Sequence, residues 1–314
     1  MKKTVFLLIL IFHFVFFTTI IIKNCKGAIS DVSTIESMTE VFNKFERAPF
    51  NKVKSFSSKF LSHSSNIESI NDFTPSGFSH YINALDEDGN GNLYAGGTFI
   101  NVDGITVNHI AKWDGTHWSA MGSGLNGDVY SIKTDNAGNV FVGGAFTNAG
   151  GIPVNYIAKW NGTTWSSLGS GLNGYPYSLR DVGSNIIVGG VFTMAGGDSA
   201  KYVAKWNGSS WSPMPGLNDV VYSISVDNGG NIYAGGNFTF VSGNVVVSRC
   251  IARWNGISWL PLGSGTNGSV TGIEFIGANL FAVGQFTNAG GVTGVNGVAG
   301  WNGSNWFSLA GGLS

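Results

Sequence analysis

Few side chains in this sequence are of the types that bind metals or act as nucleophiles. Only five of the 314 residues are histidine and two are cysteine. The histidines are His13, His63, His80, His109 and His117. A metal centre needs three or four ligands that converge on one point, and these positions show no recognisable ligand spacing. The sequence also contains no nucleophile elbow and no phosphate-binding loop. We therefore expect no catalytic residue, no metal ion and no cofactor.

The acidic segment from Asp86 to Asn92 has some of the character of a calcium loop. An EF-hand loop that begins at Asp86 requires glutamate at its twelfth position, which is Gly97 here. Related stretches at 133–139 (KTDNAGN) and 225–231 (SVDNGGN) keep the polar residues without the acidic run. The segment is therefore interpreted as an ordinary polar turn.

The composition excludes several classes of protein. Charged residues make up 11% of the chain, aromatic residues make up 13%, and the net charge is −1. A disordered charged chain would contain fewer aromatic residues, and collagen would carry glycine at every third position. No cluster of Lys and Arg indicates a nucleic-acid-binding face, so we expect no nucleic-acid partner.

Residues 79–314 consist of one unit repeated five times. The copies align on an asparagine, which lies at Asn92, Asn139, Asn185, Asn231 and Asn279. Each unit also carries two tryptophans, and successive pairs are 46 to 48 residues apart. The ten structural tryptophans are Trp113, Trp118, Trp160, Trp165, Trp206, Trp211, Trp254, Trp259, Trp301 and Trp306. Periods of 40 to 50 residues with glycine and aromatic landmarks are typical of propeller blades.

Each unit can be divided into four short strands. In the second unit they are Val129–Asp135, Asn139–Phe146, Tyr156–Trp160 and the stretch TTWSSL, with a variable loop between the second and third. An Asn-Gly or Asp-Gly dipeptide precedes the fourth strand in every unit, which favours a two-residue type I′ hairpin. The sequence therefore predicts an all-β fold, a β-propeller of five four-stranded blades of about 47 residues.

The predicted hairpin sets an expected tryptophan geometry. With Asp114-Gly115 as the two-residue turn, Trp113 pairs with Thr116 and Ala111 lies opposite Trp118. Both indoles then share one face in a diagonal arrangement. We expect these rings to supply much of the contact between blades, because each indole buries about 150–250 Å². Paired glycines such as Gly143-Gly144 are expected where a neighbouring backbone approaches closely.

The repeat resembles known propeller families. The order of a Gly-Gly strand, a variable loop, an aromatic strand and a tryptophan-bearing strand is similar to kelch and galactose-oxidase-type propellers. The stretches VGGAFTNAGG (142–151) and IAKWNGTTWSSLGSGLNG (157–174) more closely resemble secreted bacterial propeller proteins and the ectodomain of the fungal cortical polarity-marker family. The resemblance covers residues 79–314 and implies a secreted or surface propeller. It transfers no catalytic residue.

The blade count leaves two questions open. The strand near Ile82–Asp86 either belongs to the first blade or completes the last one, and both arrangements give five blades. Kelch-like rings more often have six or seven blades. Closure of a single ring, a dimer and an open crescent therefore remain alternatives.

The segments before the repeats read as an export signal and a connector. Residues 1–27 contain Lys2 and Lys3, an 18-residue apolar stretch and a small-residue end, which predicts a secretory signal peptide. An uncleaved membrane anchor is the alternative, because this stretch is longer than usual. Residues 28–78 form a linker in which Ser33 and Glu36 begin a short amphipathic helix that Pro49 ends. A membrane is expected as a partner only through that anchor.

The loops between the second and third strands vary most from unit to unit, so they are the expected recognition surface. The candidate ligand-binding residues are Asn101, Asp103, Asn148, Asp198, Lys201, Asn244 and Asn288. The predicted function is a non-enzymatic, secreted or cell-surface scaffold that binds an extracellular protein or glycan. The alternative is a hydrolase or lyase with an active site at the central mouth of the propeller. The two cysteines are Cys25, at the edge of the predicted leader, and Cys250, which lies in an apolar stretch and is predicted to be buried and unreactive.

Overall fold

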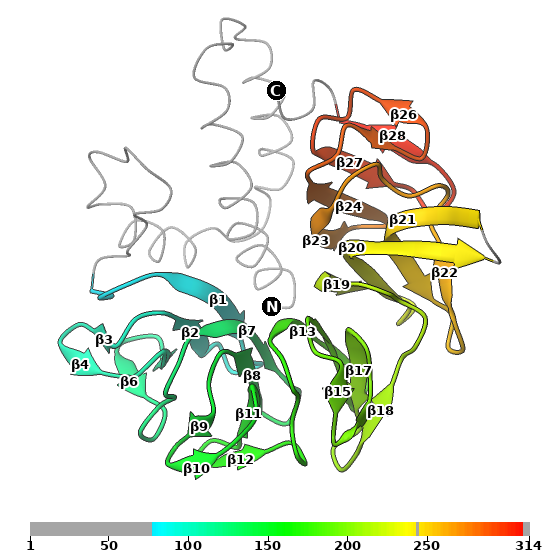
Figure 1. The fold of residues 1–314 in the computed structure, drawn as a ribbon. Coiled ribbons are helices and arrows are strands. Elements are labelled where there is room, and N and C mark those ends of the chain that lie inside the picture. Colours follow the sequence, from blue (N-terminus) through cyan, green and yellow to red (C-terminus); the bar gives the residue numbers. More distant parts are fainter. Residues whose placement is uncertain (1–76, 243–244, 310–314) are drawn as a thin grey trace, which may run out of the picture. The chain divides into compact units, whose positions relative to one another are not determined.

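The computed structural model describes residues 77–242 and 245–309 of the chain (Figure 1). The predicted leader 1–27, almost all of the linker 28–78, and Asn244 lie outside the described residues. The chain divides into two units, residues 1–81 with residue 314, and residues 82–313. All strands belong to the second unit, and the described residues contain no helix. Accordingly, no helix that could cross a membrane is found in the described part of the chain.

Five antiparallel four-stranded sheets follow one another along the chain, and we call them blades 1 to 5. Blade 1 contains β1 (Ile82–Glu87), β2 (Leu93–Gly97), β5 (Ile110–Trp113) and β6 (Trp118–Ala120). Blade 2 contains β7 (Val129–Thr134), β8 (Val140–Gly144), β11 (Ile157–Trp160) and β12 (Trp165–Ser167). Blade 3 contains β13 (Pro176–Val182), β14 (Asn185–Gly190), β17 (Val203–Trp206) and β18 (Trp211–Pro213). Blade 4 contains β19 (Val221–Val226), β20 (Ile232–Ser242), β21 (Val245–Trp254) and β22 (Trp259–Pro261). Blade 5 contains β23 (Val270–Ile276), β24 (Asn279–Gly284), β27 (Val298–Trp301) and β28 (Trp306–Ser308). This repetition confirms the predicted propeller of four-stranded blades.

The first strand decides between the two arrangements left open by the sequence. β1 pairs with β2 in its own blade, from Ile82 opposite Gly97 to Glu87 opposite Leu93. The last blade has four strands of its own, in the order β23-β24-β27-β28. Each blade is therefore built from consecutive residues of one repeat.

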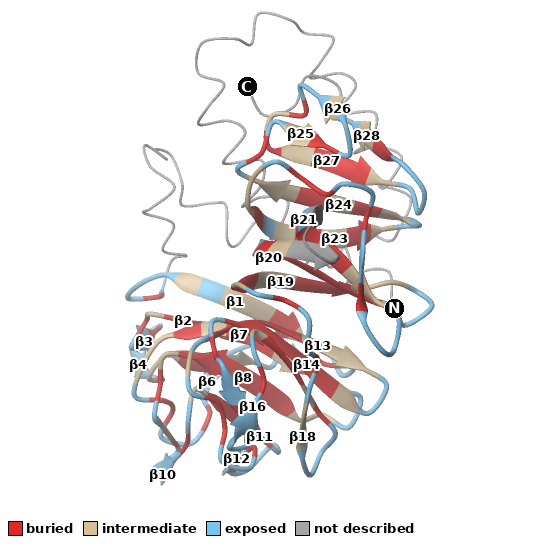
Figure 2. Ribbon diagram, turned by 45° about the vertical axis from the view of Figure 1, so that its right-hand side comes forward, coloured by how far each residue is buried: buried red, intermediate tan, exposed pale blue. Residues whose placement is uncertain are grey.

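The variable loops carry structure that the sequence did not predict. In four blades the loop between the second and third strands forms a two-stranded mini-hairpin. The pairs are β3 (Asn101–Val102) with β4 (Ile105–Thr106), β9 (Asn148–Ala149) with β10 (Ile152–Pro153), β15 (Met194–Ala195) with β16 (Asp198–Ser199), and β25 (Asn288–Ala289) with β26 (Val292–Thr293). In blade 4 the strands β20 and β21 extend instead into one long hairpin, which projects in Figure 1. Figure 2 shows that buried residues lie mainly along the blades, whereas the mini-hairpins and turns are largely exposed.

The innermost strands of successive blades pack together in the order β1, β7, β13, β19 and β23. A serine on β7, on β13 and on β19 accepts a hydrogen bond from the backbone of the next innermost strand. Ser131 Oγ accepts from Leu179 N at 2.9 Å, and Ser178 Oγ accepts from Ile224 N at 3.0 Å. These bonds satisfy backbone donors that an edge strand would otherwise leave unpaired.

The Gly-Gly pairs allow close packing, the first glycine between successive blades and the second within its own blade. A Cβ atom on Gly189 would lie 2.7 Å from the Val221 side chain of the next blade. A Cβ atom on the following Gly190 would collide with the backbone oxygen of Tyr175. The first glycine thus leaves room for a side chain of the next blade, and the second leaves room for the backbone that enters its own blade. The predicted reason for these glycines is confirmed for the second position and extended to side chains at the first.

The predicted register of the tryptophan hairpin is wrong. Trp113 pairs directly with Trp118, and the indole centroids are 5.5 Å apart, so the connecting turn has four residues and not two. The reason is the side chain that begins the turn. Asp114 Oδ1 accepts hydrogen bonds from the backbone N–H groups of Thr116 and His117, both at 2.8 Å, and this Asx turn replaces the two-residue hairpin. Only Gly115 of the dipeptide has a positive φ.

In blades 2 to 5 the second tryptophan of the hairpin links its blade to the preceding one. The indole N–H of Trp165 donates to the Met121 carbonyl at 2.8 Å, and that of Trp259 donates to the Met214 carbonyl at 3.1 Å. Trp211 and Trp306 make the equivalent bonds. The expectation that indoles supply contact between blades is therefore confirmed, with a directional hydrogen bond in addition to the buried area.

Candidate functional site

The predicted ligand-binding residues do not form one cluster. Asn101, Asp103, Asn148, Asp198 and Asn288 lie in the mini-hairpins, and Lys201 follows β16. The mini-hairpins belong to blades 1, 2, 3 and 5, and each packs beside the outermost strands of its own blade. These residues are therefore distributed over four blades, because each repeat supplies its own variable loop.

Several of these side chains stabilise their own turns. Asn148 Oδ1 accepts a hydrogen bond from Gly151 N at 3.0 Å, and Asn288 Oδ1 accepts one from Gly291 N at 3.1 Å. Asn101 Oδ1 accepts a hydrogen bond from Thr106 Oγ1 at 3.0 Å. These oxygens are used by the loops themselves, which reduces their availability to a ligand.

A different set of residues forms the most distinctive cluster at the loop end of the inner strands. We call it the tyrosine patch. It consists of Tyr130, Tyr156, Tyr175, Tyr177 and Tyr222. The ring centroids of Tyr130 and Tyr177 are 5.8 Å apart, and those of Tyr177 and Tyr222 are 6.0 Å apart. Tyr175 packs edge-on against Tyr130 at 5.9 Å and against Tyr156 at 5.5 Å.

Local irregularities in the strands position these rings. The pairing of β7 with β8 shifts between Val129 and Ser131, which places Tyr130 in a bulge. The same shift in β13 and β19 places Tyr177 and Tyr222 in equivalent bulges. A bulge redirects a side chain relative to the regular alternation of a strand. Blades 2, 3 and 4 therefore each place a tyrosine at the same register position of their innermost strand.

Tyr156 reaches the patch through an unusual backbone conformation. Its φ angle is +64°, in the left-handed region that few residues other than glycine adopt. Its carbonyl accepts a hydrogen bond from Gly144 N at 3.0 Å, and its N–H donates to Phe146 O at 3.1 Å, so the conformation is held from both sides. The corresponding residues His109, Tyr202 and Cys250 share the left-handed φ. The left-handed backbone conformation thus recurs at this position in blades 1 to 4, whereas the side chain differs between them.

The hydroxyl groups of the patch are available to a ligand. Burial, followed by the charge of Asp128 and the neighbouring phenols, raises the pKa of Tyr130. Burial, followed by Tyr222 and Tyr175, raises the pKa of Tyr177. Both phenols therefore stay protonated at neutral pH and can donate or accept a hydrogen bond. Within the described residues, none of the five hydroxyls has a hydrogen-bond partner in the protein.

The border of the patch combines polar and apolar groups. His109 Nδ1 lies 3.5 Å from Asp128 Oδ1, and the Asp128 side chain is 41% exposed. Tyr175 is 40% exposed, and its carbonyl accepts a hydrogen bond from the N–H of Val191, which is 41% exposed. A partner would thus meet aromatic, aliphatic and acidic groups together.

The opposite end of the inner strands carries charges that are already paired. Lys133 Nζ lies 3.1 Å from Asp86 Oδ2 and 3.5 Å from Asp181 Oδ1, which links blades 1, 2 and 3. Arg180 donates to Glu274 at 2.9 Å and links blades 3 and 5. Asp86 is 4% exposed and also accepts hydrogen bonds from the N–H and hydroxyl of Thr134. These side chains connect inner strands to one another.

The polar turn at Asp88 agrees with its interpretation from sequence. The Asp88 carboxylate accepts hydrogen bonds from the backbone N–H groups of Asn90 and Asn92, from Asn92 Nδ2 and from the Tyr94 hydroxyl. Burial alone would raise the pKa of Asp88, but these hydrogen bonds outweigh it and lower the pKa. In residues 77–242 and 245–309, no group of three or more His, Cys, Asp or Glu side chains is arranged to hold a metal ion.

Comparison with known proteins finds structural likeness at low sequence identity over about three quarters of this chain. No family model matches the sequence, and no curated protein matches it. The extracellular domain of a putative one-component system from B. thetaiotaomicron matches with 12% identity and a TM-score of 0.47, covering 78% of this chain and 29% of that one. YCF48 bound to D1 peptide matches with 14% identity and a TM-score of 0.46, covering 73% and 68% of the two chains. A nidogen/laminin complex matches with 13% identity and a TM-score of 0.45, covering 73% and 80%. This chain therefore spans less than a third of the length of the first of these structures.

Proposed function

We propose that the protein is a secreted or cell-surface binding scaffold, similar to kelch-type propellers, which recognises an extracellular protein or glycan through its tyrosine patch. The observation that carries this proposal is the set of five clustered tyrosines whose hydroxyls have no partner in the described protein. Tyrosine combines a large apolar ring with a polar tip and loses little conformational entropy on binding. The fold supports the rings rigidly, since three of them lie on the innermost strands β7, β13 and β19.

The location outside the cell rests on the predicted leader 1–27, and the choice of a binding function rests on the patch. The alternative, a hydrolase or lyase at the central mouth, would use carboxyl groups of the inner strands. The described acids Asp86, Asp181 and Glu274 are each paired with Lys133 or Arg180. That pairing favours the binding proposal over the alternative.

The experiment is a binding screen of the full chain against glycan and protein arrays, repeated with patch variants. Tyr130→Phe with Tyr177→Phe removes two hydroxyls and keeps the rings, whereas Tyr177→Ala removes the central ring. We expect at least a 10-fold loss of affinity for Tyr177→Ala and a smaller loss for the double Phe variant, because a central tyrosine that acts as a hot spot contributes about 2 kcal/mol or more.

The control is Asn148→Ala, which alters a predicted ligand-binding residue of a mini-hairpin and leaves the patch intact. If capture is lost in Asn148→Ala and unchanged in both patch variants, the mini-hairpins are the recognition surface and the assignment to the patch is wrong. The glycan and protein arrays separate the two classes of partner.

A further inference from the structure

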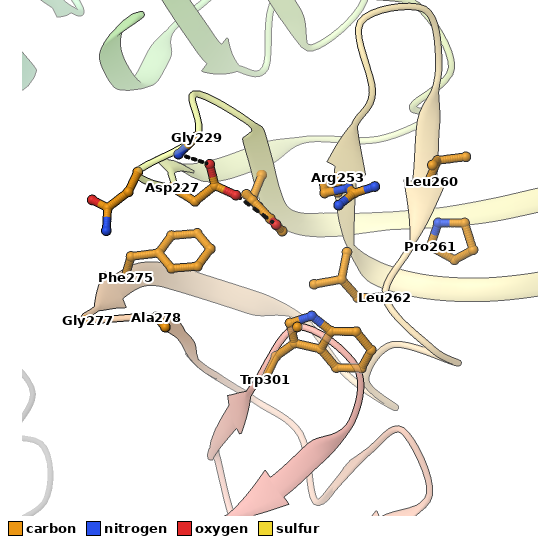
Figure 3. Close-up of a pocket in the computed structure, with 13 residues that line it drawn as sticks. Asp227, Gly229, Arg253, Leu260, Pro261, Leu262, Phe275, Gly277, Ala278 and Trp301 are labelled. Atoms are coloured by element: carbon orange, nitrogen blue, oxygen red, sulfur yellow. Dashed lines mark hydrogen bonds between the residues drawn. The ribbon is translucent and has the colours of Figure 1, made fainter.

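A second site lies between blades 4 and 5, at the end of the blades that carries the short turns (Figure 3). It is a cavity of about 510 Å³, within the range of small-molecule sites. Blade 4 contributes Tyr233, Arg253 and Leu262, and blade 5 contributes Phe275 and Trp301. Two of these lining rings join the blades, because the centroids of Tyr233 and Phe275 are 4.9 Å apart.

Two turns of unequal length border this cavity. The first two strands of blade 4 are joined by a five-residue turn, Asp227–Asn231. Those of blade 5 are joined by Gly277 and Ala278 alone. Both turns contribute to the lining of the cavity.

The acidic group of the cavity has no remaining capacity for a ligand. Asp227 Oδ1 accepts hydrogen bonds from Gly229 N and Asn231 N, and Oδ2 accepts them from Asn231 Nδ2 and the Tyr233 hydroxyl. A carboxylate offers about four lone-pair positions, so Asp227 is saturated. Burial is the largest cause that raises the pKa of Tyr233, and the phenol therefore keeps the proton that it donates to Asp227.

Arg253 is the polar group of the cavity that can still bind a ligand. Its guanidinium interacts with the Tyr233 hydroxyl. Within the described residues, it has no carboxylate partner at ion-pair distance. A guanidinium offers five N–H donors, so most of them remain for a ligand. The same register position carries lysine in blades 1, 2 and 3, at Lys112, Lys159 and Lys205, and glycine in blade 5, at Gly300. Among the five blades, arginine thus occupies this position only in blade 4, one of the two blades that border the cavity.

We propose that this cavity binds a carboxylate attached to an aromatic or other apolar body, with Arg253 as the anion-binding residue. The carboxylate accepts two parallel N–H bonds from the planar guanidinium, a geometry that lysine does not offer. The apolar body packs among Leu262, Phe275 and Trp301. Such a ligand is either a free aromatic acid or the carboxyl terminus of a chain that ends in an aromatic residue. The proposal is independent of the tyrosine patch.

The test measures binding to the full chain by isothermal titration calorimetry with two matched pairs of probes. One pair is phenylacetate and phenylacetamide, and the other is Gly-Gly-Phe with a free or an amidated carboxyl terminus. We expect each acid to bind about 10- to 100-fold more tightly than its amide, which corresponds to hydrogen bonds with a charged group. A preference confined to the peptide pair identifies a chain terminus as the source of the ligand.

Three variants locate the effect. Arg253→Leu should abolish the preference for acid over amide, and Arg253→Lys, which copies the residue of blades 1 to 3, should reduce it about 10-fold. Lys205→Leu is the matched control, because it removes a cation at the same register position in blade 3, and it should leave the preference unchanged. The proposal is overturned if acid and amide bind equally, if none of the probes binds at 10 mM, or if Arg253→Leu retains the preference.

Discussion

The indole hydrogen bond between blades allows a quantitative test at Trp259. This side chain is 1% exposed, and its N–H donates to the Met214 carbonyl at 3.1 Å. Its hairpin partner Trp254 packs against it at 5.4 Å, is only partly buried, and makes no indole hydrogen bond in the described structure. Phenylalanine at either position keeps an aromatic ring and removes the N–H. The two substitutions therefore differ mainly in the bond between blades.

The expected cost of Trp259→Phe has two parts. An unsatisfied carbonyl beside the buried Met214 costs about 1–3 kcal/mol. A void of roughly 40 Å³ costs about 1 kcal/mol, at roughly 24 cal/mol per Å³. The sum is about 2–4 kcal/mol. For Trp254→Phe we expect about 1 kcal/mol or less, because no buried carbonyl loses its donor.

Differential scanning calorimetry of the full chain measures the difference. For a unit of this length, each 1 kcal/mol lowers Tm by about 2–4 °C, so Trp259→Phe should lower Tm by about 4–16 °C. Trp254→Phe should lower Tm by about 4 °C at most. Equal shifts in the two variants, or a larger shift for Trp254→Phe, would refute the assignment of the second tryptophan as the link between blades.

Three further predictions concern packing, pH and thiol reactivity. Gly189→Ala should destabilise the protein by about 1–3 kcal/mol in urea unfolding, because the new Cβ lies 2.7 Å from the Val221 side chain. The control Gly89→Ala should be neutral, since its new Cβ has no heavy atom within 4 Å. Equal losses of stability in the two variants would contradict the packing argument. Burial alone would raise the pKa of Asp227, but hydrogen bonds from Asn231, the backbone and Tyr233 outweigh it, so the folded pKa lies below the unfolded value of about 4. The stabilisation from Asp227 is therefore complete above the unfolded pKa and is lost as pH falls through the folded pKa. The Tm should accordingly drop between pH 5 and pH 2. A drop of the same size in Asn231→Ala would refute the hydrogen bonds to Asp227 as its cause. Burial raises the pKa of the Cys250 thiol, so in a Cys25→Ser background it should react with a disulfide reagent slowly in the folded protein and quickly in urea; equal rates would show that the thiol is accessible.

The repeat and its strand pattern were predictable because their signals are local. Strands such as Val129–Thr134 and Val140–Gly144 follow from alternating apolar residues between polar turns, and the five-fold repetition of the pattern gives the number of blades. The glycine pairs were also interpretable, since a missing side chain on a central strand indicates close approach of a neighbour.

The candidate site was less predictable for two physical reasons. The patch tyrosines Tyr130 and Tyr177 occupy ordinary strand positions in the sequence, and only the shift in pairing of the inner strands places them in bulges. The residues of the mini-hairpins, by contrast, vary between repeats as a binding loop would, but several of their side chains already form hydrogen bonds within their own loops. Asn148 and Asn288 use their side-chain oxygens to close their own turns, which sequence variation does not reveal.

The amino-acid sequence by itself determined the class of fold, the number of repeats and the order of strands, because these depend on periodic patterns within single repeats. Only the tertiary structure decided the register of the tryptophan hairpins, the blade to which β1 belongs, the tyrosine patch and the cavity at Arg253. Each of these depends on partners about 45 residues apart or on competition between alternative hydrogen bonds. The Asx turn at Asp114 illustrates the difference, because a single carboxylate oxygen shifted the pairing that the Asp-Gly dipeptide had predicted.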